Sequence, residues 1–311
     1  MIRKILFTFA LIIGLSVNAQ SVDAWKDCKG NINFIVVNDL GRNGYYDQKP
    51  IAELMGEVAD VIGPEAVLAL GDTHHFDGVQ SISDPLWMTN YETIYSHPEL
   101  MIAWYAICGN HEYRGNTQAV IDYSSISRRW EMPARYYTNT FEDDGTTVRI
   151  VFLDTTPLMT KYQKDTITYP DACKQDAQAQ LKWLEQTLAS AKEDWVVVVG
   201  HHPIYADTSK SESERLDMQR TVDPILRKYK VPMYICGHIH NFQHIVKANS
   251  SVDYIVNSSG SLSRTKVNAI DGTQFVSGDS GFSILSVSKH KLSLSMLDRN
   301  GNVIYKIEKE K

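Results

Sequence analysis

The chain has 311 residues, of which 43% are hydrophobic and 10% aromatic, so it can bury a large core and does not have a disordered composition. Its formal net charge of −6 at pH 7 argues against nucleic acid or an anionic membrane surface as a partner. If the substrate is an anion, local cations such as bound metal ions must attract it.

The first nineteen residues have the pattern of a secretory signal peptide. Arg3 and Lys4 precede an apolar run at 5–15, which is too short to span a membrane, and the segment 17–19 (Val-Asn-Ala) offers a small-residue cleavage site. We expect a mature chain that begins near Gln20 and is located in the periplasm or outside the cell. Without Arg3 and Lys4 it has 29 basic and 37 acidic residues, a net charge of −8. A buried amino-terminal helix or an uncleaved anchor is the alternative.

Apolar runs and amphipathic segments alternate along the rest of the chain. Strands are predicted at 33–38, 66–70, 101–108, 147–153, 195–199 and 231–236, and helices at 50–62, 117–127, 176–191 and 223–229. From Tyr254 onward we expect only strands and turns. This order predicts a βαβ architecture in a single domain at 20–311, and the β-rich tail suggests a second sheet.

The four cysteines fall into two pairs by context. Cys108 and Cys236 each end an apolar strand and are expected to be small buried side chains. Cys28 and Cys173 lie in polar segments, and export would permit a disulfide between them, a question that their spacing leaves open.

Five polar motifs follow the predicted strands, and four of them contain seven of the ten histidines. Ligands in such folds bind at the carboxyl ends of strands, so these side chains should converge. Carboxylate, amide and imidazole groups gathered in this way can hold two metal ions, and such a site hydrolyses phosphate esters. The motifs are Asn38-Asp39-Leu40-Gly41, Gly71-Asp72-Thr73-His74-His75, Gly109-Asn110-His111-Glu112, Gly200-His201-His202-Pro203 and Gly237-His238-Ile239-His240.

Two of these motifs suggest specific ligands. Asp72 directly follows a strand-end glycine, so it is the natural carboxylate to bridge two ions; a turn-forming role is its alternative, and for Asp39 a turn is the stronger reading. In extended backbone, His238 and His240 would point the same way and address adjacent ions. A hydrogen bond to the backbone is the alternative for His240.

The Gly-Asn-His-Glu motif combines a ligand with a proton donor. Asn110 offers a neutral oxygen, and His111 is the best candidate to protonate a leaving alkoxide, since imidazole titrates near neutral pH. Glu112 would hold the tautomer of His111 or remain a solvated carboxylate.

These motifs resemble those of the calcineurin-like metallophosphoesterases, in particular the small animal-type (tartrate-resistant) purple acid phosphatases. Further similar segments, such as Trp104-Tyr105, Gly115-Asn116 and Tyr136-Tyr137, extend the resemblance from about residue 32 to 260. It implies an α/β fold, a four-layer αββα sandwich of two mixed β-sheets flanked by helices. It also implies one metal ion held by Asp39, Asp72 and His240, a second held by Asp72, Asn110, His201 and His238, and His111 as the leaving-group acid.

The sequence departs from the purple enzymes at one position. They place a tyrosine, whose phenolate colours ferric iron, three residues after the bridging aspartate, and this chain has His75 there. We expect His75 to be a nitrogen ligand, with His74 as the alternative, and the two ions to be divalent Fe, Mn or Zn in a protein that is not purple. His202 would contact the substrate phosphate or support the metal ligands.

The resulting hypothesis is a secreted phosphomonoesterase. A metal-bound hydroxide would attack a small-molecule phosphate ester, with His111 as general acid and His202 as a further catalytic candidate. We expect a monomer without nucleic acid or stable membrane association. The alternatives are a phosphodiesterase or nucleotidase with the same metals, and a non-catalytic binding protein. Four aromatic residues could stack a base or aryl group, although packing is the simpler role: Tyr45, Tyr46, Trp87 and Tyr113.

Overall fold

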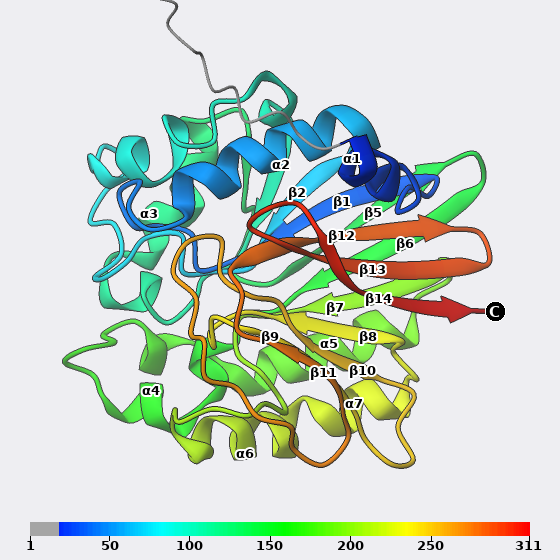
Figure 1. Cartoon of the computed structure of the whole chain (residues 1–311). Helices are drawn as coiled ribbons and strands as arrows, with labels where there is room; N and C mark the ends of the chain where they lie inside the picture. The colour runs from blue at the N-terminus through cyan, green and yellow to red at the C-terminus, as the bar shows by residue number, and fades with distance from the viewer. Residues whose placement is uncertain (1–18) are drawn as a thin grey trace, which may run out of the picture.

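The computed structural model describes residues 19–311 (Figure 1). The predicted signal peptide therefore lies outside the described residues, apart from Ala19, which begins helix α1 (Ala19–Lys26). Within the described range, no helix is long and apolar enough to cross a membrane.

In the described part of the chain, fourteen strands form two seven-stranded sheets. The first has the order β14-β13-β12-β1-β2-β3-β4, and its strands β1 to β4 run parallel. Antiparallel pairing adds β12, β13 and β14, so the sheet is mixed. The bounds are β1 (Ile32–Val37), β2 (Ala66–Ala69), β3 (Ala103–Ala106), β4 (Trp130–Glu131), β12 (Gly281–Ser288), β13 (Lys291–Asp298) and β14 (Val303–Glu310).

The second sheet has the order β11-β9-β10-β8-β7-β6-β5. Its strands β6, β7, β8 and β10 are parallel, while β5, β9 and β11 pair antiparallel, so this sheet is mixed too. The bounds are β5 (Tyr137–Asp143), β6 (Thr146–Phe152), β7 (Trp195–Val199), β8 (Met233–Cys236), β9 (Phe242–Val246), β10 (Asp253–Val256) and β11 (Thr273–Ser277).

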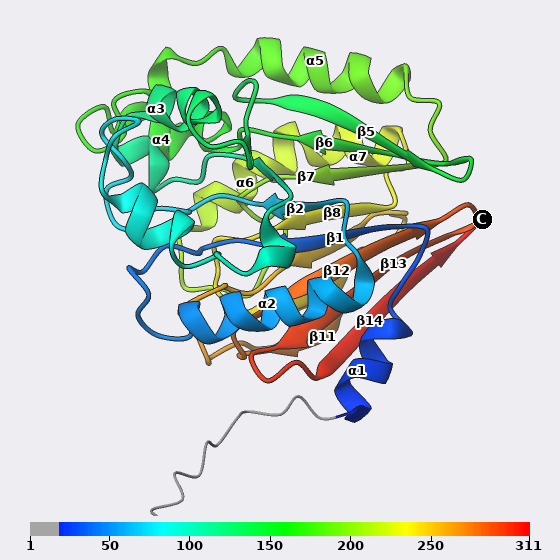
Figure 2. The same ribbon diagram turned by 90° about the horizontal axis from the view of Figure 1, so that it is seen from above.

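Helices cover the outer face of each sheet. Helices α1 and α2 (Gln48–Ile62) lie on the first sheet, and α5 (Ala177–Ala189), α6 (Glu212–Thr221) and α7 (Asp223–Lys228) on the second (Figure 1). Figure 2 shows both sheets between α2 and α5, which confirms the predicted four-layer αββα sandwich. Short helices α3 (Thr117–Asp122) and α4 (Thr160–Lys164) lie at one end of the sheets. Single turns occur at Met88–Glu92, Pro98–Leu100, Glu112–Arg114, Tyr123–Ser125, Thr156–Leu158 and Ala172–Lys174.

Helix α2 illustrates how the sequence builds these layers. Its apolar residues recur at helical spacing, so one face, which includes Ile51, Met55 and Val58, is buried. The helix ends at Gly63, whose φ of 58° is left-handed, and its N–H donates to the Ala59 carbonyl at 2.9 Å.

The missed elements are those without a strong apolar pattern. Edge strand β5 is largely polar, α6 contains few apolar residues, and β9 is short. The helix predicted at 117–127 is shorter, because α3 ends at Asp122 and a single 3-10 turn follows. The possible disulfide is absent: Cys28 is buried, Cys173 is exposed, and both are free, as are the buried Cys108 and Cys236.

Candidate dinuclear metal centre

The parallel strands of both sheets end at the same side of the molecule, on the left of Figure 1. The loops after β1, β2 and β3 carry Asp39, Asp72 and Asn110 from the first sheet. The loops after β7 and β8 carry the histidines of the second sheet, His201, His202, His238 and His240. The fold thus brings five sequence-distant motifs to one edge, as the alternation of strands and helices predicts.

One group of ligand atoms centres on Asp39. Its Oδ1 lies 3.0 Å from His240 Nε2, and both residues form a buried cluster with His75 whose potential ligand atoms lie within 4.8 Å of one another. Asp39 also forms a second cluster, with Asp72 and His201. Two carboxylates and an imidazole from three different loops therefore meet at this point.

A second group centres on Asp72. Its Oδ2 lies 3.1 Å from His201 Nε2, 3.6 Å from His75 Nε2 and 3.9 Å from His111 Nε2. Asp72 therefore faces ligands of both groups, which is the position that a bridging carboxylate requires.

The unsatisfied polar atoms test whether metal ions fit this site. Among the described residues, five buried atoms at the centre have no hydrogen-bond partner: Asp39 Oδ1, Asp72 Oδ2, Asn110 Oδ1, His75 Nε2 and His201 Nε2. Buried polar atoms without partners are costly, so their convergence needs an explanation. Oxygen and imidazole nitrogen are the donors that Zn, Mn and Fe accept, and the residues therefore fit a pair of such ions.

Hydrogen bonds at the other ring nitrogen orient three of these imidazoles. His201 Nδ1 donates to the Leu70 carbonyl at 2.8 Å, and His240 Nδ1 donates to Leu262 at 2.6 Å. His75 Nδ1 lies 3.2 Å from the Gly41 carbonyl. Each bond places the proton on Nδ1 and leaves Nε2 as a free ligand.

His238 is oriented by side chains instead. Its Nε2 lies 3.1 Å from Glu214 Oε2, and its Nδ1 lies 3.1 Å from Lys210 Nζ. With the proton on Nε2, Nδ1 is the acceptor nitrogen of His238, and Lys210 Nζ donates to it in this structure. Glu214 is buried and also accepts from Lys161 and Tyr162 at 2.6 and 3.0 Å, so the carboxylate is firmly held.

The backbone at the ligands is not extended. Asp39, Asp72, His238 and His240 have φ values of 53°, 53°, 72° and 65°, in the left-handed region. The argument that His238 and His240 point the same way in extended backbone is therefore wrong. The two rings nevertheless serve different clusters, since His238 groups with His201 and His202, and His240 with Asp39 and His75.

Glu112 has neither of its predicted roles. It is fully buried, and its carboxylate accepts from the backbone N–H groups of Asp72, His74 and Gly109 at 2.9, 3.0 and 2.7 Å. Burial, followed by the charge of Asp72, raises the pKa of Glu112 to about 7. The His111 ring is held by the Phe76 carbonyl, which bonds its Nδ1 at 2.5 Å. Glu112 fixes the loops that carry Asp72 and Asn110.

The other two motif histidines, His74 and His202, are held by contacts of their own. His74 packs edge-on against Trp87 with ring centroids 4.4 Å apart, and burial lowers its pKa to about 3. The structure thus places His75, not His74, at the centre. Both nitrogens of His202 are engaged, Nδ1 with Thr155 Oγ1 at 2.8 Å and Nε2 with Tyr162 OH at 3.1 Å.

The charges at the centre favour cations. Burial alone would raise the pKa of Asp72, but the imidazoles of His201, His111 and His75 hold it well below its usual value. Burial would lower the pKa of His201, yet the carboxylates of Asp72 and Asp39 raise it to about 9.

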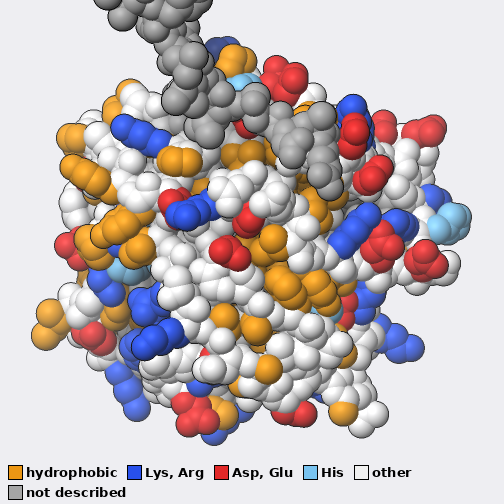
Figure 3. Space-filling model, viewed as in Figure 1, with side chains coloured by type: hydrophobic (Ala, Val, Ile, Leu, Met, Phe, Trp, Pro, Cys, Tyr) orange, Lys and Arg blue, Asp and Glu red, His pale blue; other side chains and the backbone are white. Residues whose placement is uncertain are grey.

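Sequence reasoning missed the cationic side chains beside the ligands. Burial lowers the pKa of Lys210 to about 8, and it lowers that of Arg42, whereas Asp39 and Asp72 favour the charged form of both. Arg264 lies close enough to interact with both cations. Figure 3 shows a group of Lys and Arg side chains on the left, where the parallel strands end. The sequence signal for Arg42 and Lys210 is their position in loops that follow two of the motifs.

The comparisons with known proteins agree with this geometry. Residues 32–242 match the model of the calcineurin-like phosphoesterase family. Tartrate-resistant acid phosphatase type 5 from Oryctolagus cuniculus is 31% identical over 294 residues, which cover 88% of this chain and 90% of that protein. Purple acid phosphatase 4 from Arabidopsis thaliana is 30% identical over 293 residues, which cover 91% and 84%.

Solved structures share the fold. GAP50, the anchor in the inner membrane complex of Plasmodium, has a TM-score of 0.76 at 22% identity, covering 90% of this chain and 88% of that one. A dimetal phosphatase from Danio rerio has a TM-score of 0.64 at 12% identity, covering 90% and 99%. The matched family model and the acid phosphatase relatives confirm the resemblance that the motifs suggest, and this chain belongs to the calcineurin-like phosphoesterase family.

Proposed function

We propose that this protein is an exported phosphomonoesterase that works with two bound metal ions. The observation that carries the proposal is the convergence of five partnerless ligand atoms from both sheets. The similarity to acid phosphatases over most of the chain supports the same class of reaction. One ion would be held by Asp39, Asp72, His75 and His240, and the other by Asp72, Asn110, His201 and His238.

The metal ions supply the electrostatic part of the chemistry. When bound, they neutralise the phosphate and lower the pKa of water so that it can attack phosphorus. Because His75 contributes a neutral imidazole in place of an anionic phenolate, the first site favours a divalent ion. Fe, Mn and Zn all accept this donor set.

His111 is positioned to protonate the leaving group. The Phe76 carbonyl holds its Nδ1, so Nε2 faces the centre, where it lies 3.9 Å from Asp72 Oδ2. The ring is partly exposed, as a group that meets substrate must be. A protonated His111 would donate from Nε2 to the departing alkoxide.

His202 supports the ligands rather than the phosphate in this proposal. It is fully buried, both its nitrogens are engaged, and its ring centroid lies 4.3 Å from that of His238. Lys210 and Arg42 are better placed to bind phosphate oxygens, because they supply positive charge at the edge of the centre.

Elemental analysis combined with a phosphate-release assay tests the proposal. We expect about two metal ions per chain and release of phosphate from monoesters in preference to diesters. Replacement of Asp72 by Asn should remove both metal and activity, whereas the matched change of exposed Asp60 on α2 should alter neither. A diester preference would instead favour the phosphodiesterase reading, and a metal-loaded protein that releases no phosphate would contradict catalysis.

A His111→Asn variant tests the acid separately. It should keep its metal and turn over alkyl phosphates roughly 10²–10⁴-fold more slowly, the usual effect of losing general acid catalysis. A good leaving group such as p-nitrophenolate should reduce the loss. Full activity on an alkyl ester would exclude this role.

A further inference from the structure

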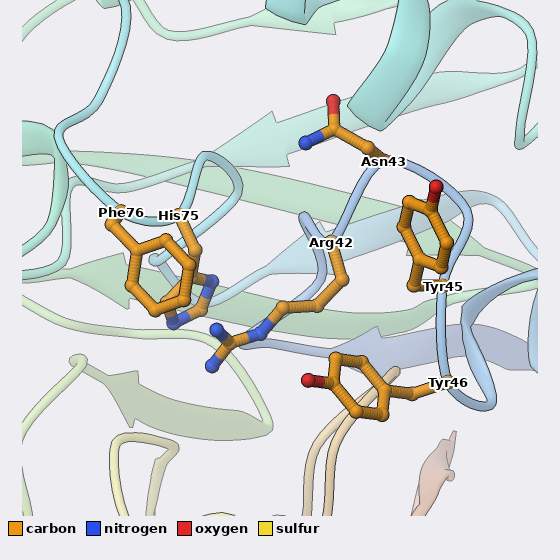
Figure 4. A pocket seen from close by; sticks show the side chains of 6 residues that line it. All are labelled: Arg42, Asn43, Tyr45, Tyr46, His75 and Phe76. Carbon is orange, nitrogen blue, oxygen red and sulfur yellow. The ribbon is translucent and has the colours of Figure 1, made fainter.

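We infer that the preferred substrates carry a planar aromatic group on the alcohol side of the phosphate ester, held in a pocket beside His75. This inference rests on the phosphatase function proposed above and adds a substrate class to it. The pocket has a volume of about 360 Å³ and opens next to the metal centre, because His75 belongs to both (Figure 4). Its lining residues are Arg42, Asn43, Tyr45, Tyr46, His75 and Phe76.

The exposed aromatic side chains of the described chain gather in this pocket. Within residues 19–311, the exposed Phe, Tyr and Trp side chains are Tyr45, Tyr46 and Phe76, at 72%, 63% and 64%. Isolated exposed aromatics are ordinary, but three from two different loops around one pocket mark a binding surface. By contrast, Trp87 and Tyr113 are buried: Trp87 stacks on Tyr123, and Tyr113 bonds Asp154, so both have the packing role that the sequence favoured.

The loop that carries the two tyrosines is held in a strained shape. Asn43, Gly44 and Tyr46 have φ values of 54°, 77° and 56°, and positive φ is rare for a bulky residue such as tyrosine. The side chain of Gln48 accepts from the N–H groups of Arg42 and Gly44 at 3.0 and 2.8 Å. Backbone strain persists where surrounding contacts enforce it, which is typical of ligand-binding loops.

Arg42 connects the aromatic walls to the metal centre. Its guanidinium lies over the Phe76 ring, 4.9 Å from the centroid, and Figure 4 shows it directed toward His75 and Phe76. Its Nε is buried and has no hydrogen-bond partner among the described residues. A phosphate at the metals would take this donor, and the group esterified to it would then lie among Phe76, Tyr45 and Tyr46.

Matched substrate pairs test the inference. 2-Phenylethyl and 2-cyclohexylethyl phosphate have similar leaving groups and sizes but differ in aromaticity, so their kcat/KM ratio isolates the pocket. We expect the phenyl ester to be favoured about 3- to 10-fold, the usual effect of an aromatic contact beyond buried area. The kcat/KM ratio of adenosine monophosphate to ribose 5-phosphate makes the same comparison for a nucleobase, because only the first compound carries one. A preference for the phenyl compound alone assigns small esters that carry a benzene ring, and a preference for the base assigns nucleotides.

Variants and a binding measurement complete the test. Tyr45→Leu and Phe76→Leu should bring both ratios close to one. Met101→Leu should keep both ratios, because Met101 is exposed just before β3, at the opposite end of that strand from the site. Calorimetry with 2-phenylethyl- and 2-cyclohexylethylphosphonate should give the same preference without turnover. Equal rates and equal binding within every pair overturn the inference and leave the phosphatase function intact. If no ester is hydrolysed, the proposed function fails, and the phosphonates still decide the pocket.

Discussion

At the scale of single residues, the centre depends on side chains whose backbone is energetically unfavourable. Asp39 and Asp72 follow their strands with left-handed φ, a conformation that costs a non-glycine residue about 1–3 kcal/mol. Local bonds compensate at Asp39, since its Oδ2 accepts from Asn38 Nδ2 at 2.7 Å and from the His238 N–H at 2.8 Å. Because these bonds hold Oδ2 of Asp39, its other carboxylate oxygen, Oδ1, has no backbone partner and faces the metal site.

Glu214 offers a test of how the second ion is held. In Glu214→Gln the carboxylate that orients His238 becomes a neutral amide, so we expect metal affinity to fall about 10- to 100-fold while the protein remains folded. Competition with a chromogenic chelator measures this affinity directly. Glu212→Gln on the same helix, at an exposed position, is the matched control and should bind normally. An unchanged affinity in Glu214→Gln would show that His238 needs no such partner.

His75 offers a test of the colour of the centre. Its Nε2 lies 3.6 Å from Asp72 Oδ2, so a tyrosine at this position would bring its phenolate near the same ion. We expect the iron-loaded natural protein to lack an intense visible band and His75→Tyr to gain one, because a phenolate donates charge to ferric iron and a neutral imidazole does not. Absorption spectra after oxidation decide the matter. An intense band in the natural protein would refute the divalent, colourless centre.

At the scale of elements, the sequence predicts most of what builds the site. Buried strands are continuous apolar runs, so β1, β2, β7 and β8 stand out, and the glycine motifs after them identify the ligand loops. Helix α6 could not be found in the same way, since only Glu214 and Met218 among its residues are buried. The orienting role of Glu214 therefore appears only when α6 is packed beside the loop after β8.

The errors at the site have one cause. Predictions of side-chain direction assumed extended backbone, whereas the loops turn sharply at His238 and His240. The sequence places Glu112 beside His111, but its carboxylate oxygens accept from N–H groups of two different loops. Periodicity describes regular elements, and a loop's path depends on contacts between segments that are distant in sequence.

The loops after β2 and β3 approach so closely that a single methyl group should separate them. A Cβ on Gly109 would lie 2.2 Å from Asp72 Oδ1, far inside contact distance. We expect Gly109→Ala to displace Asp72 and to lose most of its bound metal, measured as metal per chain, while circular dichroism shows the sheets intact. Gly145→Ala is the control, since a Cβ there meets nothing within 4 Å. Full metal content in Gly109→Ala would mean that the loops can move apart without cost to the site.

At the scale of the whole molecule, an acidic chain encloses a site for an anionic substrate. The net charge of −6 opposes phosphate at long range, so binding depends on bound metal ions and on the nearby Lys210, Arg42 and Arg264. The two sheets meet through packed side chains, for example where the rings of Phe34 and Phe141 lie 4.7 Å apart, and through single hydrogen bonds such as that from the Tyr137 hydroxyl to the Ala106 carbonyl at 2.8 Å. Ions ligated from both sheets would therefore add cross-links between the two halves of the sandwich.

Chelation should consequently lower the stability of the entire domain. Ions that bind the folded state alone, at free concentrations about 1,000-fold above Kd, contribute about 4 kcal/mol per site, and at about 2 °C per kcal/mol for a chain of this size Tm should fall by roughly 8 °C or more. Thermal unfolding with and without a chelator measures the shift, and added metal should restore it. Asp72→Asn lacks the bridging carboxylate, so its Tm should respond to neither treatment. A natural protein whose Tm is indifferent to chelation, although metal analysis shows that the ions have left, would mean that the ligand loops do not join the two sheets energetically.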